Sequence, residues 1–204
     1  MAQHNKPKNS GSGTVFKNPI LEKLSKTHIA VPLTVFGIIS IVLFVYGIME
    51  GFFNPLIGLG VLFAGFLTFT LIEYIMHRFV FHITPKTPKQ EKFAYTVHGV
   101  HHDYPKDKDR LAMPIPASLL LSTGFFFLYQ AIMGTFVFAF LPGFLLGYAS
   151  YLGVHYMVHA FQPPKNFFKV LWVHHGIHHY KDPGNAFGVS SPFWDYIFRT
   201  MPKK

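Results

Sequence analysis

Long runs of hydrophobic residues alternate with polar segments along this chain. The run over 29–49 has about the length that crosses a bilayer, for which roughly 20 apolar residues suffice. A second run covers 53–75 and is interrupted only by Glu73, near its end. This pattern predicts two membrane-spanning helices, preceded by a polar and flexible N-terminal tail over 1–28.

The apolar stretch from Ile115 to Ser150 is too long for one ordinary span. Gly134 and the pair Pro142–Gly143 can break it into a tight hairpin of two uncharged helices, which we expect over 115–133 and 136–155. The sequence therefore predicts an all-α membrane protein with four transmembrane helices, forming a single membrane-embedded domain over 29–204.

The charged residues are few and unevenly placed. They make up 13% of the chain, whereas a soluble domain has about 25%. All 18 Lys and Arg residues lie before the first span, between the second and third, or after the fourth. The positive-inside rule predicts that both termini and the large loop are cytoplasmic, at the inner membrane of a bacterium or the endoplasmic reticulum of a eukaryote. A nucleic-acid partner is excluded, because its basic surface would not be divided by long apolar runs.

Histidine is the most abundant residue type in this chain that can bind a metal ion. The chain has 13 histidines and no cysteine, which excludes disulfides, thiolate zinc sites, iron–sulfur clusters and a cysteine nucleophile. Any metal must therefore be bound by histidine or carboxylate. Eleven histidines fall in four short windows: His77 and His82; His98, His101 and His102; His155 and His159; His174, His175, His178 and His179.

The spacing within these windows is typical of metal ligands. Residues at i, i+3 and i+4 share one helical face, so we expect each His-x-x-His-His triplet to converge on one point. His77 and His82 are five residues apart and would diverge on a straight helix, so we expect the helix to end there, before Pro85. Burying so many imidazoles without a metal or another partner would be costly.

The predicted topology brings all four windows to the cytoplasmic boundary. Ten or eleven imidazoles exceed the needs of one ion, because zinc takes four ligands and an octahedral metal six. The sequence therefore predicts a histidine-rich helical cap that holds two metal ions. Histidine binds Zn, Fe and Cu alike, so the ligands do not name the metal.

Two carboxylates are candidate partners of the histidines. Glu73 lies four residues before His77 on the same helical face, within an otherwise apolar span. An acidic residue at such a depth is expected to be functional, and we predict that it orients a histidine. Asp195 is expected to pair with a histidine or with Arg110.

These motifs resemble those of the fatty acid hydroxylase superfamily, which includes sterol desaturases and carotenoid hydroxylases. The family pattern HxxxxH, HxxHH, HxxxH and HxxHH is matched in order and in gap length. The likeness is closer to fatty acid 2-hydroxylases of sphingolipid synthesis and covers roughly 71–200. It is carried by LIEYIMHRFVFH, HGVHH, DRLAMPIPASL, LLGY, HHGIHH and FGVSSPFWDYIFRT.

The resemblance implies a role for each clustered histidine. The ten that match the pattern would be the ligands of two metal ions, expected to be iron in the working enzyme, although zinc can occupy such a site in purified protein. His174 would lie beside the ligands or on the substrate side. Where this family often has YDxTHY, the present chain has YLGVHY, with Leu152 and Val154 in place of the aspartate and threonine.

The implied activity is oxygen-dependent hydroxylation of a lipid C–H bond, at the 2-position of a fatty acyl chain that is free or part of a sphingolipid or ceramide. Eukaryotic relatives usually carry an N-terminal haem-binding cytochrome domain. Because only a polar tail stands there, we expect a separate electron-transfer protein to supply electrons.

Two other functions remain open from the sequence. A carotenoid or sterol hydroxylase or desaturase would have the same clusters. A metal transporter is less favoured, because transporters place polar ligands near the middle of the membrane, in broken helices, whereas these clusters are predicted at one boundary.

Overall fold

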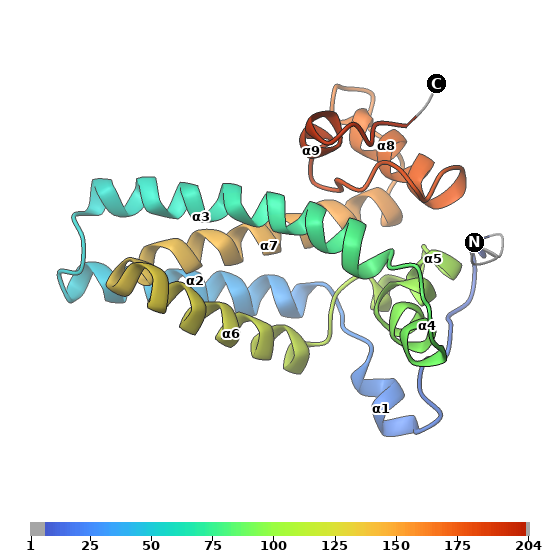
Figure 1. Cartoon of the computed structure of the whole chain (residues 1–204), viewed down its shortest axis with the longest axis horizontal. Helices are drawn as coiled ribbons and strands as arrows, with labels where there is room; N and C mark the ends of the chain where they lie inside the picture. Colours follow the sequence, from blue (N-terminus) through green and yellow to red (C-terminus); the bar gives the residue numbers. More distant parts are fainter. Residues whose placement is uncertain (1–6, 203–204) are drawn as a thin grey trace.

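The computed structural model describes residues 7–202, which form an all-helical protein (Figure 1). Its elements, in chain order, are α1 (Pro19–Leu24), α2 (Ala30–Met49), α3 (Pro55–Ile75), a π-helical turn (Met76–Phe81), α4 (Pro88–Ala94), a second π-helical turn (Tyr95–Gly99), α5 (Val100–Asp103), a 3-10 turn (Lys108–Arg110), α6 (Ile115–Met133), a 3-10 turn (Gly134–Phe136), α7 (Val137–Ala160), α8 (Lys169–Tyr180) and α9 (Phe193–Ile197).

The four long helices, α2, α3, α6 and α7, lie side by side, and the short helices α4, α5, α8 and α9 form a cap at one end of them (Figure 1). Three helical stretches are long and apolar enough to cross a membrane: Ala30–Met49, Pro55–Phe81 and Lys108–Ala160. The third stretch contains both α6 and α7.

The chain reverses between α6 and α7 at Gly134, which has a φ of +58° that favours glycine. The break expected at Pro142–Gly143 does not occur, because both residues lie inside α7. Pro142 lies in the second turn of α7, where its missing amide leaves only the carbonyl four residues earlier, that of Phe138, without its helical hydrogen bond. Ser40 of α2 donates a hydrogen bond to the carbonyl of Pro142 at 3.2 Å.

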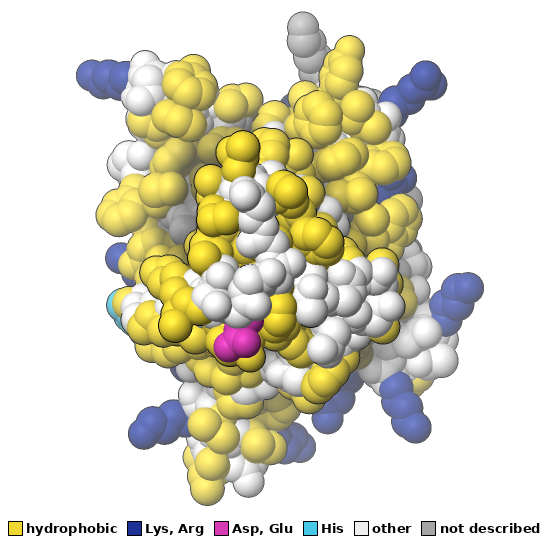
Figure 2. Space-filling view, turned by 90° about the vertical axis from the view of Figure 1, so that its left-hand side faces the viewer, with side chains coloured by type: hydrophobic (Ala, Val, Ile, Leu, Met, Phe, Trp, Pro, Cys, Tyr) yellow, Lys and Arg dark blue, Asp and Glu magenta, His cyan; other side chains and the backbone are white. Residues whose placement is uncertain are grey.

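The end of the bundle opposite the cap is almost free of charge. Figure 2 looks onto this end and shows mostly hydrophobic and uncharged side chains, a small acidic area, and Lys and Arg only at the margins. The connections that lie here, 50–54 and 134–136, contain no basic residue. Basic side chains are thus concentrated toward the cap, as the sequence indicates.

The contact between α3 and α7 depends on two glycines. A Cβ at Gly65 would lie 2.0 Å from the carbonyl oxygen of Phe140, and a Cβ at Gly143 would lie 1.8 Å from that of Leu62. The two backbones therefore touch, as small residues allow in membrane helices. Around this contact lies the main apolar core, formed by Phe36, Phe69, Tyr129, Val137, Phe140, Leu141, Phe144 and Leu145.

Of the predicted N-terminal tail over 1–28, residues 7–18 lie along the cap instead of standing free, and residues 19–24 form α1. The amide of Lys8 donates to the carbonyl of Asp103 at 2.8 Å, and the hydroxyl of Tyr180 donates to Asn9 Oδ1 at 2.8 Å. Gly13 packs so tightly that a Cβ would lie 3.0 Å from the ring of Tyr104. The segment therefore bridges α5 and α8, which a polar composition alone does not reveal.

Replacing Gly143 with Ala should lower the free energy of unfolding by at least about 2 kcal/mol, because the methyl group would force α3 and α7 apart. Thermal unfolding in detergent measures the loss. Gly124→Ala on α6 is the matched control, because a Cβ there meets no atom within 4 Å. Equal stability of the two variants would contradict a backbone contact between α3 and α7.

Candidate metal centre

The first histidine pair is aligned by a change of helix type. α3 continues into the π-helical turn Met76–Phe81, and the amide of His82 donates to the carbonyl of His77 at 3.1 Å. A π-helix closes its turn over five residues, so His77 and His82 face the same way. The π-helical turn thus avoids the divergence that a straight α-helix would impose on this pair, and the predicted end of the helix before Pro85 is confirmed.

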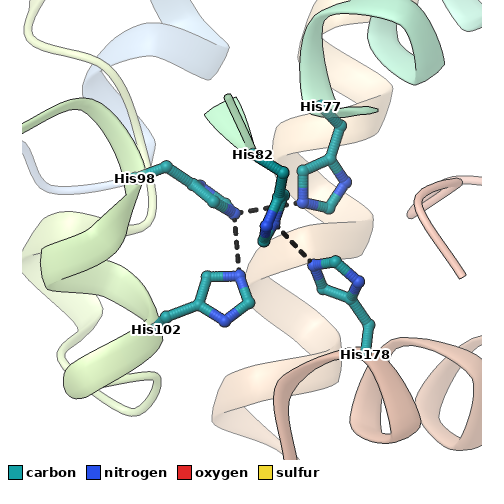
Figure 3. A group of neighbouring side chains, drawn as sticks. All are labelled: His77, His82, His98, His102 and His178. Carbon is teal, nitrogen blue, oxygen red and sulfur yellow. Dashed lines mark hydrogen bonds between the residues drawn. The ribbon is translucent and has the colours of Figure 1, made fainter. Parts of the chain in front are cut away.

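The ten histidines that match the sequence pattern lie together in two groups. In each group one ring nitrogen per residue lies within 4.8 Å of all the others. We call His77, His82, His98, His102 and His178 the first group, shown in Figure 3 with the rings pointing toward one another, and His101, His155, His159, His175 and His179 the second group.

Each His-x-x-His-His triplet is divided between the two groups, so the expectation that a triplet converges on one point is wrong. His98 and His102 belong to the first group, and His101 to the second. His175 and His179 belong to the second group, and His178 to the first. Adjacent residues on an α-helix point about 100° apart, whereas residues at i and i+4 differ by only about 40°. The histidines of one helical turn can therefore point into both groups.

The distances between ring nitrogens suit a shared ion. Nε2–Nε2 separations are 3.0 Å for His77–His98 and His98–His102, 2.9 Å for His82–His178, 3.0 Å for His101–His155 and 2.9 Å for His159–His175. Two nitrogens about 2.1 Å from one metal and at right angles to each other lie about 3.0 Å apart. Right angles are typical of octahedral coordination.

Burial keeps these rings neutral, as metal ligands must be. In the cap, burial lowers the pKa of His98, His101, His175, His178 and His179 well below its usual value, and neighbouring histidines lower it further. Neither ring nitrogen of His179 has a hydrogen-bond partner among the described residues. Unpaired buried nitrogens are rare in proteins, and a metal ion would satisfy one of these two. The donor set therefore fits divalent metal ions.

Backbone carbonyls orient three of the rings. His77 Nδ1 donates to the carbonyl of Phe187, and His178 Nδ1 donates to that of Asn185 at 2.7 Å. His155 Nδ1 is 3.2 Å from the carbonyl of Leu111. A hydrogen bond at Nδ1 fixes the tautomer that leaves the Nε2 lone pair free for a metal.

Two of these carbonyls belong to one loop, residues 185–190, and both serve the first group. Glu73 of α3 binds this loop: its Oε1 accepts from the amides of Val189 at 2.8 Å and Ser190 at 2.9 Å. The prediction that Glu73 pairs with a histidine is therefore wrong. Its carboxylate instead satisfies backbone amides of a segment more than a hundred residues away, which its position in the sequence does not indicate.

Asp195 holds the same loop from α9. This carboxylate has no exposed surface and accepts from the amides of Phe187 at 2.8 Å and Gly188 at 2.7 Å. It also accepts from Thr200 Oγ1 at 2.7 Å and His174 Nε2 at 3.0 Å. Burial by itself would raise the pKa of Asp195, but these hydrogen bonds outweigh it and lower the pKa.

The structure shows the partner of Asp195 and the position of His174, both of which the sequence leaves open. Asp195 pairs with a histidine, His174, whereas Arg110 pairs with Glu22. His174 belongs to neither histidine group. Sequence reasoning missed the carbonyls of Asn185 and Phe187, because backbone groups carry no residue-specific signal.

An aromatic side chain covers the first group. The ring of Phe187 lies 5.9 Å from that of His77, 5.7 Å from that of His82 and 5.6 Å from that of His178, between ring centres. Phe81 stacks on His98 at 5.2 Å. These rings limit the access of water, which strengthens electrostatic interactions at the centre.

Known proteins share both the sequence and the fold. The chain is 36% identical over 154 residues to a dihydroceramide fatty acyl 2-hydroxylase of Arabidopsis thaliana, covering 75% of this chain and 65% of the relative. It is 35% identical over 197 residues to a ceramide very long chain fatty acid hydroxylase of Schizosaccharomyces pombe, covering 94% and 55%. The chain thus spans between about half and two thirds of these relatives.

A solved structure of full-length scs7p, in which only the hydroxylase domain is visible, matches with a TM-score of 0.87 and 32% identity, over 95% of this chain and 74% of that one. The model of the family described as fatty acid hydroxylase matches residues 62–200, which include all ten histidines of the two groups. The chain therefore belongs to the fatty acid hydroxylase family.

Proposed function

We propose that this protein is a membrane-bound oxygenase that hydroxylates the 2-position of a fatty acyl chain, free or within a sphingolipid or ceramide. The observation that carries the proposal is the pair of adjacent five-histidine groups, assembled from four separate segments. The similarity to ceramide and fatty acyl 2-hydroxylases supports the substrate class.

The two groups would hold two metal ions, one in each. Iron is the expected metal, and zinc would fit the same nitrogens. When bound, the metals supply the activation of molecular oxygen with electrons from a separate donor protein. The chain's own contribution is to hold neutral imidazoles in place and to limit water. The carbonyls of Asn185, Phe187 and Leu111 fix three ring tautomers for this purpose.

The depth of the site favours attack near the carboxyl end of a lipid. Both long helices that carry histidines to the site, α3 and α7, lead from the apolar bundle into the cap. His77 and His82 follow the end of α3, and His155 and His159 lie in the last turns of α7. The carbonyl group of a membrane lipid lies at this boundary, with its acyl chain in the bilayer. The carbon next to the carbonyl, the 2-position, would then lie at the level of the histidines.

The proposed topology has four crossings, with α6 and α7 as the last two. Both termini and the cap would be cytoplasmic, because every Lys and Arg lies before α2, between α3 and α6, or after α7. A cytoplasmic cap would also face a soluble or peripheral electron donor.

Expression of the wild-type protein should produce lipids heavier by one oxygen, with fragmentation placing the hydroxyl at the 2-position of the acyl chain. Lipid mass spectrometry of cells with and without the protein measures this. His101→Ala serves as the inactive control. Loss of two hydrogens would indicate a desaturase, and a hydroxylated sterol or carotenoid would indicate a different substrate class.

Metal analysis of purified protein tests the ligands. His101→Ala and His178→Ala should each lose up to one of two ions per chain, because each removes a ligand from one group, and activity should be abolished. His174→Ala is the matched control, since it removes a buried imidazole outside both groups and should retain most metal. Full metal content in the first two variants would refute the ligand assignment.

Asp195→Asn tests the role of the loop 185–190. The amide group replaces one carboxylate acceptor with a donor, so one of the four bonds at this site must break. We expect metal affinity at the first group to fall about 10- to 100-fold, as for other residues that orient metal ligands. Asp109→Asn, at an exposed position, should have no effect on metal dissociation during dialysis. Unchanged dissociation in Asp195→Asn would show that the loop does not position the ligands.

A further inference from the structure

A groove of about 790 Å³ lies where α1 meets the beginnings of α2 and α6. Its apolar wall includes Ile20, Val31 and Ile115, and its polar side includes Lys23 and Lys26. None of the described residues that line it is acidic. The groove lies apart from both histidine groups, whose residues do not line it.

The groove lies at the level where two apolar helices begin. α2 starts at Ala30 and α6 at Ile115, and both belong to stretches apolar enough to cross a membrane. The beginnings of such helices lie near the lipid headgroups. The polar side of the groove therefore lies at the level of the lipid headgroups, and its apolar side lies at the level of the acyl chains.

α1 has the composition of a helix that lies in this interfacial layer. None of its residues is buried, and the side chains of Ile20 and Leu24 are 68% and 56% exposed. Large apolar side chains beside lysines are typical of helices that rest in the headgroup region. The long stems of the lysines can lie on apolar surface while their ammonium groups reach the phosphates.

The helix is held firmly to the rest of the protein. Glu22 accepts hydrogen bonds from the amides of Val15 and Phe16, both at 3.0 Å, and pairs with Arg110. Burial would raise the pKa of Glu22, but these hydrogen bonds and the guanidinium lower it, so the carboxylate stays ionised. Because α1 does not need to become ordered when a ligand binds, its side of the groove is preformed.

The positive charge of the groove is only partly balanced. Arg110 takes up the negative charge of Glu22, and Lys26 Nζ reaches the same carboxylate only at 4.0 Å. Lys23 forms no ion pair with any described residue. An anionic group would complete this site, whereas an uncharged lipid such as a ceramide would leave Lys23 without an ion pair and Lys26 with only its long contact to Glu22.

We propose that this groove binds an anionic glycerophospholipid. Lys23 and Lys26 contact its phosphate, and the first methylenes of its acyl chains lie against Ile20, Val31 and Ile115. A lipid fits better than free phosphate because α2 and α6, which supply the apolar wall through Val31 and Ile115, also expose large apolar side chains farther along, such as Ile38 and Leu120. This proposal does not depend on the proposed hydroxylase activity.

Native mass spectrometry of the full chain in detergent tests the site, with phosphatidylglycerol and phosphatidylcholine titrated separately. Wild-type protein should retain phosphatidylglycerol in preference to phosphatidylcholine. Lys23→Gln/Lys26→Gln should weaken phosphatidylglycerol binding roughly ten- to thirtyfold, at about fivefold per lysine, and leave phosphatidylcholine binding unchanged. Lys89→Gln/Lys92→Gln on α4 removes the same charge elsewhere and should retain the preference.

Three outcomes would overturn the proposal: no preference in the wild type, equal loss in both double variants, or displacement of the lipid by millimolar inorganic phosphate. The first means that no anion site exists, the second that only net charge matters, and the third that the site takes free phosphate. Thermal unfolding of each variant checks that it remains folded. A third variant, Ile20→Gln, should weaken phosphatidylglycerol binding while leaving the lysines in place.

Discussion

The constraint on which the rest of the site depends is an exchange of histidines between the two halves of the chain. His101 comes from the N-terminal half and joins the second group, and His178 comes from the C-terminal half and joins the first. Neither group is complete within its own half. Because each group requires both halves to be docked, the geometry of the centre and the packing of the cap form together, and a metal bound at either group would stabilise that docking by mass action.

The distance between the halves is set in the bundle of long apolar helices. Gly65 and Gly143 allow the backbones of α3 and α7 to touch, and the two helices lead to the pairs His77–His82 and His155–His159. A larger residue at either glycine would separate these pairs as well as the helices. The close backbone contact in the bundle thus has a direct consequence for the site, several helical turns away.

Two buried carboxylates support the centre without touching the first group. Glu73 and Asp195 hold the loop 185–190 from different helices, and this loop presents the carbonyls that orient His77 and His178. A charged acceptor bound to several backbone amides is a strong and directional anchor. Gly188 is needed at this point, since a Cβ there would lie 2.2 Å from the carbonyl oxygen of Ser191 and 2.8 Å from Asp195.

The sequence by itself determined the helical class, the long apolar stretches and the ten clustered histidines, because hydrophobic length and ligand spacing are local properties of the chain. Only the tertiary structure decided how those histidines are divided. Helical periodicity predicts which residues share a face, but His101 and His102 serve different groups because a partner lies on either side of one turn. The π-helical turn that aligns His77 with His82, the loop that Glu73 binds and the path of residues 7–18 over the cap also depend on contacts between distant segments. No pattern of spacing encodes such contacts, since each is made by a backbone group or by a neighbour far away along the chain.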